Sequence, residues 1–190
     1  LAVVATLCSH GMDLQTVLGT LEQLQAVPGR TQIVSGDDDD ILVVVDYAHT
    51  PDALQKILGA LREQAGQKLW CVFGCGGNRD RGKRPQMAEV AAGLADEVIV
   101  TSDNPRDEQP ATIIAEIVPG FAGRKHRVIE DRAGAIAAAI SEAQRGDVVL
   151  LAGKGHEHYQ EVAGCRLPFS DSEQARIALS LRRGVAGGAT

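Results

Sequence analysis

Apolar, β-branched runs alternate with helical patterns through most of this chain. Runs that are rich in Val, Ile and Leu and apolar throughout predict strands buried on both faces. They cover residues 41–45, 69–73, 97–100, 126–129 and 147–151. Between and after them, apolar residues recur at the spacing of a helix. The expected helices cover about residues 52–65, 84–95, 110–118, 131–145 and 171–183.

This alternation of strand and helix predicts the fold class. We expect an α/β, Rossmann-like fold with a mostly parallel sheet of about five to six strands flanked by helices. The segment YQEVAGCRLPF near the end can add a short hairpin. Aromatic residues make up only 3% of the chain, against 44% hydrophobic residues in all, so we expect an aliphatic core.

The first part of the chain has a different pattern. Residues 1–25 are helical in character, and Asp13 can cap their second half. The segment VPGR then interrupts the pattern with Pro28 and Gly29, which suggests a domain boundary. We therefore expect one unit in residues 1–27 and another in residues 28–190. The chain is expected to begin inside a folded element, as a fragment would, because its start does not resemble a cleaved leader.

Charge and composition argue against several classes of protein. The net charge of −6 disfavours a broad nucleic-acid surface, and no apolar run has the length of a membrane span. The acidic run SGDDDD predicts a solvated turn rather than a metal site. The cysteines lack metal-ligand spacing, which favours reduced thiols in a cytosolic protein. They are Cys8, Cys71, Cys75 and Cys165.

Polar or glycine-rich turns follow four of the predicted strands. Because ligands of parallel sheets bind beyond the carboxyl ends of the strands, we expect these turns to form a single site. The turns are DYAHTPD (46–52), GCGGNRDRGKR (74–84), TSDNPRDE (101–108) and AGKGHEHYQE (152–161).

The turn at 74–84 resembles a phosphate-binding loop in Gly77, Gly82 and Lys83. Arg84, however, stands where that loop needs a Ser or Thr to hold magnesium, so we reject a true P-loop. Cations just before a helix still predict a site for a carboxylate or phosphate, with a solvated basic loop as the alternative. They are Arg79, Arg81, Lys83 and Arg84.

In the turn at 46–52, Thr50 and Pro51 are expected to cap the next helix. This role leaves Asp46 and His49 unexplained. His49 can donate to a base, a ribose or a phosphate, or be a structural histidine.

In the turn at 152–161, Gly153 lets the backbone approach a ligand closely, and Glu157 can pair with an ammonium group. His156 and His158 have no third ligand nearby, so a metal is not predicted.

The segment DNPR (103–106) has the most distinctive composition. Pro105 fixes its own φ and keeps Asn104 out of the helical region, so the turn is stiff. Arg106 offers a planar fork suited to a carboxylate, while Asp103 and Asn104 offer acceptors. Such a turn can hold a zwitterion. The alternative is a proline turn that caps the following helix.

Together, VVVDYAHTPDAL, VFGCGGNRDRGKRPQM, VTSDNPRDEQP and LLAGKGHEHYQ resemble the C-terminal domain of the Mur ligases, in the same order, over about residues 27–185. The resemblance implies that residues 1–27 are the end of that family's central, ATP-binding domain and that residues 28–190 bind the acceptor amino acid. One departure is Gln32, where family members often carry Glu.

The resemblance also implies a reaction. ATP phosphorylates the D-glutamate γ-carboxylate of UDP-MurNAc-L-Ala-D-Glu, and the amine of a diamino acid attacks the acyl phosphate to form an amide in cytoplasmic peptidoglycan synthesis. ATP and Mg²⁺ are the implied cofactors. The P-loop and magnesium ligands belong to the part that precedes this chain, so we expect no catalytic residue and no metal ligand here, and no activity from the isolated chain.

The DNPR segment is similar to that of members adding meso-2,6-diaminopimelate, which is lysine with a second carboxylate. Arg106 would bind that carboxylate and would be left unpaired by lysine. By resemblance, the amino acid is contacted by Arg79, Asp103, Asn104, Pro105, Arg106, Gly153 and Glu157. The nucleotide contacts are Arg30, Asp46, His49 and, near a phosphate, Lys83. A lysine-adding ligase and a non-catalytic module that binds an amino acid or nucleotide remain alternatives.

Overall fold

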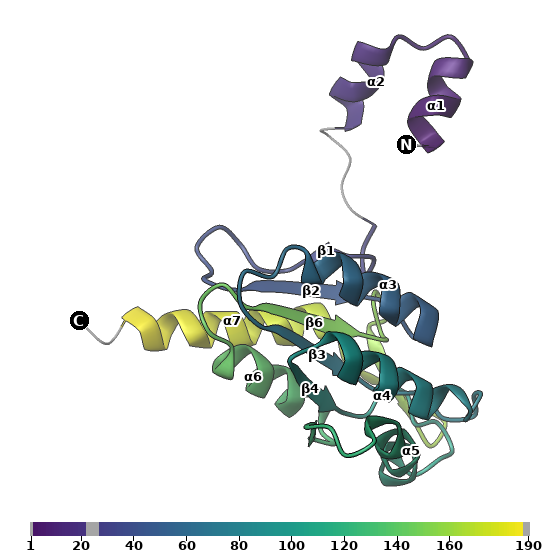
Figure 1. Ribbon diagram of the computed structural model, residues 1–190, viewed down its shortest axis with the longest axis vertical. Coiled ribbons are helices and arrows are strands. Elements are labelled where there is room, and N and C mark those ends of the chain that lie inside the picture. The colour runs from purple at the N-terminus through teal and green to yellow at the C-terminus, as the bar shows by residue number, and fades with distance from the viewer. Residues whose placement is uncertain (1, 22–26, 188–190) are drawn as a thin grey trace.

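The computed structural model describes residues 2–21 and 27–187 (Figure 1). Two helices come first, α1 (Ala2–Ser9) and α2 (Leu14–Leu21), and they contact each other. Asp13 caps α2, because its carboxylate accepts a hydrogen bond of 3.0 Å from the Thr16 amide. The predicted helical character is thus confirmed for most of residues 1–25. Residue 1 and residues 22–25 lie outside the described residues.

A six-stranded sheet follows, in the order β1-β2-β6-β3-β4-β5, and all neighbouring strands are parallel except β1 and β2. The predicted α/β class with a mostly parallel sheet is therefore confirmed. The strands are β1 (Gln32–Ile33), β2 (Leu42–Asp46), β3 (Leu69–Phe73), β4 (Glu97–Val100), β5 (Arg127–Val128) and β6 (Val148–Ala152). β1 was not predicted, since two residues are too few to show a pattern.

Helices cover both faces of the sheet (Figure 1). One face carries α3 (Pro51–Arg62), α4 (Lys83–Leu94), α5 (Pro110–Ile117) and the 3-10 helix η1 (Val118–Phe121). The other face carries α6 (Arg132–Glu142) and α7 (Asp171–Gly187).

Side chains of the central strands alternate between these faces. In β3, Cys71 and Phe73 point to the first face, while Trp70 and Val72 point to the second. Both faces are covered, and this is why the central strands are apolar throughout.

The strand order places the end of β6 between the ends of β2 and β3. Ala152 at the end of β6 pairs with Asp46 on one side and with Phe73 on the other. Val100 at the end of β4 pairs with Phe73 in turn. The four turns that follow these strands therefore begin at one level of the sheet, which gives the predicted convergence its physical basis.

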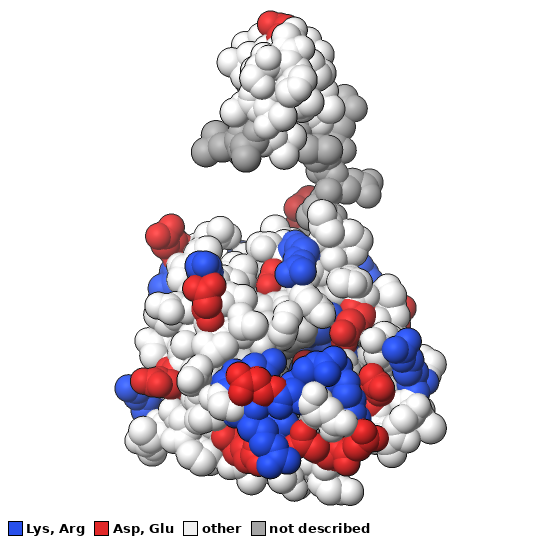
Figure 2. Space-filling model, turned by 90° about the vertical axis from the view of Figure 1, so that its right-hand side faces the viewer, with Lys and Arg blue, Asp and Glu red and all other residues white. Residues whose placement is uncertain are grey.

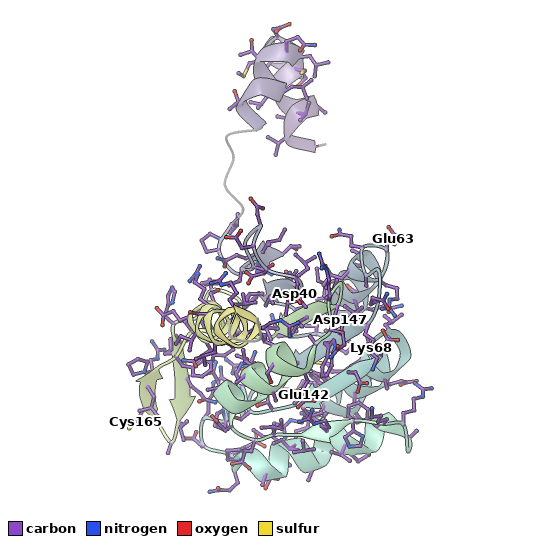
Figure 3. All side chains as sticks on the ribbon, turned by 90° about the vertical axis from the view of Figure 1, so that its left-hand side faces the viewer. Asp40, Glu63, Lys68, Glu142, Asp147 and Cys165 are labelled. Carbon is purple, nitrogen blue, oxygen red and sulfur yellow. The ribbon has the colours of Figure 1, made fainter. Side chains whose placement is uncertain are left out.

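The opposite end of the sheet is fastened by Asp147, which is labelled in Figure 3. Its carboxylate accepts hydrogen bonds from the Lys68 amide at 2.9 Å, the Trp70 indole at 2.9 Å and the Gln144 amide at 2.8 Å. The only tryptophan of the chain is thus anchored where β3 and β6 begin.

The predicted hairpin is confirmed as β7 (Tyr159–Val162) and β8 (Cys165–Pro168), which pair antiparallel. A parallel bridge joins Val162 of this hairpin to Arg106 in the turn after β4. The hairpin is consequently attached to the DNPR segment.

The acidic turn at 36–40 differs from its prediction as a merely solvated loop. Asp39 pairs with Arg183 Nη1 at 3.1 Å, and Asp40 pairs with Arg182 Nε at 2.8 Å. Both arginines belong to α7. The prediction was wrong for Asp39, whose side chain is only 2% exposed, whereas Asp40 is exposed as predicted and also has a partner that is remote in sequence.

Two further findings concern the cysteines and the helices. Burial raises the pKa of the Cys71 and Cys75 thiols to about 12, so both stay protonated and unreactive at neutral pH. Among the helices within residues 2–21 and 27–187, none is long and apolar enough to cross a bilayer.

Candidate binding cleft

A cleft of about 340 Å³ opens at the carboxyl ends of the strands, and residues from all four predicted turns line it. Figure 2 shows Lys and Arg gathered on this side of the molecule, with Asp and Glu beside them. The lining residues are Tyr47, His49, Thr50, Gly76, Arg79, Asp80, Lys83, Asp103, Asn104, Arg106, Gly153 and Glu157. Of the predicted site residues, Arg30, Asp46 and Pro105 are not among them.

The DNPR segment packs directly on the glycine loop after β3. The Gly77 amide donates to the Asn104 carbonyl at 2.9 Å, and a Cβ on Gly77 would lie 1.9 Å from the Pro105 carbonyl oxygen. Only glycine fits at such a distance. Pro105 thus contributes backbone packing. The alternative that DNPR caps the next helix is wrong, because α5 begins later, at Pro110.

Asn104 is nearly inaccessible, and both ends of its side-chain amide have partners in the protein. Its Nδ2 donates to Glu157 Oε2 at 2.7 Å, while its Oδ1 accepts from Lys154 Nζ at 2.9 Å and from the Glu161 amide at 3.0 Å. These partners fix which way the amide points. Asn104 therefore orients Glu157, in addition to the ligand contact predicted for it.

Lys154 lies fully buried beneath this group. Besides Asn104, its Nζ lies 3.2 Å from Glu157 Oε2 and 3.8 Å from Asp103 Oδ1. The cation partly neutralises two of the carboxylates that line the cleft, Asp103 and Glu157. This role of Lys154 was not predicted, because a lysine in a glycine-rich turn is usually solvated.

Position 153 requires a glycine for two reasons, its backbone conformation and the closeness of Asp103. Its φ is +114°, and a Cβ there would lie 2.6 Å from Asp103 Oδ2. The Gly153 amide also donates to the Asp46 carbonyl at 3.1 Å. The turn after β6 is thereby held against the turns after β2 and β4.

Arg106 also has a positive φ, of +52°, which is uncommon for a residue with a side chain. Its Nη1 donates to the Gly77 carbonyl at 2.8 Å, and its Nε lies 3.5 Å from Glu161 Oε2. The expectation that Arg106 lacks a partner without a ligand carboxylate was therefore wrong. One edge of the guanidinium has partners in the protein, and the residue also lines the cleft.

The basic loop at 74–84 is only partly available to an anion. Arg84 is fully buried and pairs with Glu108 at 2.9 Å and Glu116 at 2.6 Å, and Arg81 pairs with the same two residues. The prediction that all four cations serve an anion was wrong for Arg81 and Arg84. Arg79 and Lys83 are the two that line the cleft.

The turn after β2 combines structural contacts with an exposed rim. Asp46 accepts from the Thr31 amide at 2.7 Å and from the Ala48 amide at 2.8 Å, so its carboxylate ties the preceding segment to the turn. The predicted cap is confirmed, since Thr50 Oγ1 accepts from the Ala53 amide at 3.3 Å, and Pro51 opens α3.

The rim itself is formed by Arg30, Tyr47 and His49. The Arg30 guanidinium lies 4.7 Å from the centre of the Tyr47 ring, and the His49 ring packs edge-on against that ring. Lys83 Nζ donates to the His49 carbonyl at 2.8 Å. The nucleotide contacts predicted for Arg30, Asp46, His49 and Lys83 stay predictions.

Within residues 2–21 and 27–187, no group of three His, Cys, Asp or Glu side chains is placed to hold a metal ion. His156 instead packs against Tyr47, with 5.5 Å between ring centres.

The cleft is thus lined by cationic side chains, Arg79, Lys83 and Arg106, and by carboxylates, Asp80, Asp103 and Glu157. This arrangement suits a small molecule that carries both carboxylate and ammonium groups. Fold and cleft together define an α/β domain with a charged cleft at the carboxyl ends of its strands.

Comparison with known proteins identifies the family. The family model described as "Mur ligase, glutamate ligase domain" matches residues 29–155. This chain belongs to that family. A solved structure titled UDP-N-acetylmuramoyl-L-alanyl-D-glutamate–2,6-diaminopimelate ligase superimposes with a TM-score of 0.77 at 46% identity, covering 95% of this chain and 37% of that one.

Curated relatives carry the same name. The protein of Pseudomonas aeruginosa is 58% identical over 181 residues, which cover 95% of this chain and 37% of the relative. That of Janthinobacterium sp. (strain Marseille) is 54% identical over 187 residues, covering 96% of this chain and 36% of the relative. This chain therefore spans a little over a third of the length of these relatives.

A more distant structure agrees in fold. The UDP-N-acetylmuramate-alanine ligase of Thermotoga maritima has a TM-score of 0.65 at 23% identity, covering 97% of this chain and 36% of that one.

Proposed function

We propose that this chain is the acceptor-binding part of a UDP-N-acetylmuramoyl-tripeptide synthetase. That enzyme is an ATP-dependent ligase that adds meso-2,6-diaminopimelate to UDP-MurNAc-L-Ala-D-Glu in cytoplasmic peptidoglycan synthesis. The observation that carries the proposal is that Arg106, Asp103 and Glu157 line one cleft. The names of relatives more than 50% identical to this chain support it.

The amino acid fits the charges of the cleft. Diaminopimelate has a carboxylate and an ammonium group at each end, whereas lysine has only an ammonium group at its side-chain end. Arg106 and Arg79 donate charge-assisted hydrogen bonds to the distal carboxylate. Asp103 and Glu157 receive an ammonium group, with Asn104 orienting Glu157, while Gly153 leaves the space. Pro105 keeps the DNPR segment on the glycine loop.

The rim of the cleft serves the nucleotide in this proposal. At one edge, Arg30 and Lys83 supply cations, and His49 supplies a ring packed edge-on against Tyr47. Asp46 holds the turn that carries His49 and ties it to Thr31, the residue after Arg30. ATP supplies the phosphoryl group that activates the D-glutamate γ-carboxylate, and the acceptor amine then attacks the acyl phosphate. Residues 28–190 position that amine, which lowers the barrier by holding the reactants together.

Residues 1–27 are assigned to the end of the central domain. We assign the P-loop and the Mg²⁺ ligands to the part that precedes this chain, in keeping with the charge pairing already described for Arg84. No catalytic residue is assigned to residues 28–190, and the isolated chain is expected to be inactive. Ligase turnover by the 190 residues alone would contradict this division.

The test is calorimetric titration of the chain with meso-2,6-diaminopimelate and with L-lysine. We expect tighter binding of diaminopimelate, and Arg106→Ala should weaken it by about 10-fold to 100-fold, the value of a charge-assisted hydrogen-bonded pair. Lysine binding should change little. Arg176→Ala, an exposed arginine on α7, is the matched control.

The alternatives give different results in this experiment. A lysine-adding ligase would prefer lysine, and Arg106→Ala would leave that preference unchanged. A binding module without ligase function would show full affinity for an unrelated amino acid or nucleotide in place of diaminopimelate.

A further inference from the structure

Arg106 has a carboxylate partner within its own chain. Its Nε lies 3.5 Å from Glu161 Oε2, and the two side chains are only 20% and 26% exposed. Glu161 belongs to β7 and does not line the cleft, whereas Arg106 does. The positive charge of Arg106, which a ligand in the cleft would meet, therefore already has the negative charge of Glu161 beside it.

The backbone holds Glu161 in this position. The Arg106 amide donates to the Glu161 carbonyl at 2.9 Å, and the Ala163 amide donates to the Arg106 carbonyl at 2.7 Å. The Glu161 amide donates to Asn104 Oδ1 at 3.0 Å. On the other side of this residue, Gln160 Nε2 donates to the Asp103 carbonyl at 2.7 Å. Each of residues 160, 161 and 163 is thus tied to the DNPR segment, so the backbone of Glu161 is held beside Arg106.

The pair is close but does not saturate the guanidinium. A charge-assisted hydrogen bond between Arg and a carboxylate is typically 2.7–2.9 Å long, which is shorter than the 3.5 Å seen here. Gly77 accepts one further hydrogen bond from Nη1. A guanidinium has five N–H donors, so Arg106 keeps free donors for the cleft.

We propose that Glu161 acts through Arg106 and lowers the affinity of Arg106 for carboxylates. This inference rests on the proposed function, in which Arg106 receives the distal carboxylate of the acceptor. A guanidinium without Glu161 would attract any small carboxylate that entered the cleft. With Glu161 present, a lone carboxylate gains little, and a ligand is retained only if its ammonium group is also bound by Asp103 and Glu157.

The same contact changes how lysine is rejected. With lysine bound, Arg106 still has Glu161 and the Gly77 carbonyl as partners. Lysine is therefore rejected because it has no distal carboxylate for Arg106 to bind. An unpaired Arg106 contributes little to this rejection.

The variant Glu161→Gln separates the charge of Glu161 from its structural contacts. All the hydrogen bonds that tie residue 161 to the DNPR segment come from its backbone, so they remain in the variant. Only the negative charge beside Arg106 is lost. If Glu161 were merely structural, this change would leave anion affinity as it was.

The first measurement uses sodium acetate as the probe. The Nε–Hε resonance of Arg106 is followed by NMR while acetate is added to the chain and to its Glu161→Gln variant. We expect acetate to bind the variant about threefold to tenfold more tightly, which is the size of a repulsion between partly exposed carboxylates. The affinity for meso-2,6-diaminopimelate should rise by a similar factor, and that for L-lysine should stay unchanged.

Two controls test the route of the effect. Glu63→Gln removes the same charge at an exposed position on the side of the molecule shown in Figure 3, and it should alter neither affinity. In an Arg106→Ala background, Glu161→Gln should no longer tighten diaminopimelate binding, because the residue through which it acts is gone.

The outcomes separate this inference from the proposed function. Equal acetate affinity in the chain and in Glu161→Gln, or a gain that persists without Arg106, would overturn the role of Glu161. If acetate binds the variant more tightly but the parent chain does not prefer diaminopimelate to lysine, the proposed acceptor is wrong and the effect of Glu161 on Arg106 stands.

Discussion

At the scale of single residues, Lys154 supplies a buried positive charge next to two carboxylates of the cleft. Its buried Nζ contacts Asn104, Glu157 and, at 3.8 Å, Asp103. Two carboxylates so close together would repel each other without a cation between them. Lys154 also fixes the Asn104 amide, whose other end holds Glu157.

We predict that Lys154→Met, which keeps the length of the side chain, weakens diaminopimelate binding about tenfold or more. The free energy of unfolding should fall by about 1–3 kcal/mol, because Asn104 Oδ1 loses one of its two donors and Glu157 loses its cationic partner. Calorimetry and urea unfolding measure the two effects. Lys56→Met, an exposed lysine paired with Asp52 on α3, is the control. Unchanged affinity in Lys154→Met would show that the cation does not organise the cleft.

At the scale of elements, Glu108 joins the glycine loop after β3 to the start of α4. It accepts from the Asn78 amide at 2.6 Å and pairs with Arg81 and Arg84. The Arg84 hydrogen bonds and the Asn78 amide lower the pKa of the Glu108 carboxyl from 4.5 to about 2. A group whose pKa is lowered on folding stabilises the folded state at any pH above its unfolded value.

We therefore predict that the contribution of Glu108 is complete above about pH 4.5 and is lost as the pH falls toward 2. Glu108→Gln should lower the urea midpoint at pH 7 and should flatten the loss of stability between these two pH values. Urea unfolding at pH 7, 4.5 and 3 measures this. The same substitution at Glu89, exposed on α4, should leave the acid limb of the curve intact. A variant with an unaltered acid limb would contradict the assignment.

At the scale of the whole molecule, one buried ion pair joins the layers of the fold below the cleft. Arg132 at the start of α6 and Asp171 at the start of α7 form a bidentate pair with both contacts at 2.7 Å, and neither side chain is exposed. Arg132 also donates to the carbonyls of Ala152 at 2.9 Å and Ser102 at 3.3 Å. These carbonyls immediately precede Gly153 and Asp103, so the pair supports two turns of the cleft.

We predict that Arg132→Met lowers the free energy of unfolding by about 3–5 kcal/mol, because it leaves Asp171 buried without a partner. The double variant Arg132→Met/Asp171→Leu should recover much of that loss, since no charge then remains buried. Urea unfolding followed by circular dichroism compares the three proteins. A double variant less stable than Arg132→Met would show that the pair itself is strongly stabilising.

The sequence by itself determined the type and order of the main elements. β2, β3, β4 and β6 were predictable because residues buried on both faces of a sheet must be apolar throughout. The cap formed by Thr50 and Pro51 was predictable because its contacts lie within four residues. The location of the cleft followed from the rule that parallel strands end at one edge of their sheet.

Tertiary structure decided which charges meet when their residues are far apart in the sequence. Lys154 and Asn104 are 50 residues apart, and Arg84 finds its partners 24 and 32 residues away, so no local pattern shows that these side chains are buried and paired. The same holds for Glu161 beside Arg106 and for Asp40 beside Arg182. Local sequence encodes burial and backbone geometry over a few residues. The energy of a buried charge depends on partners that only the strand order brings near, and here that order places β6 between β2 and β3.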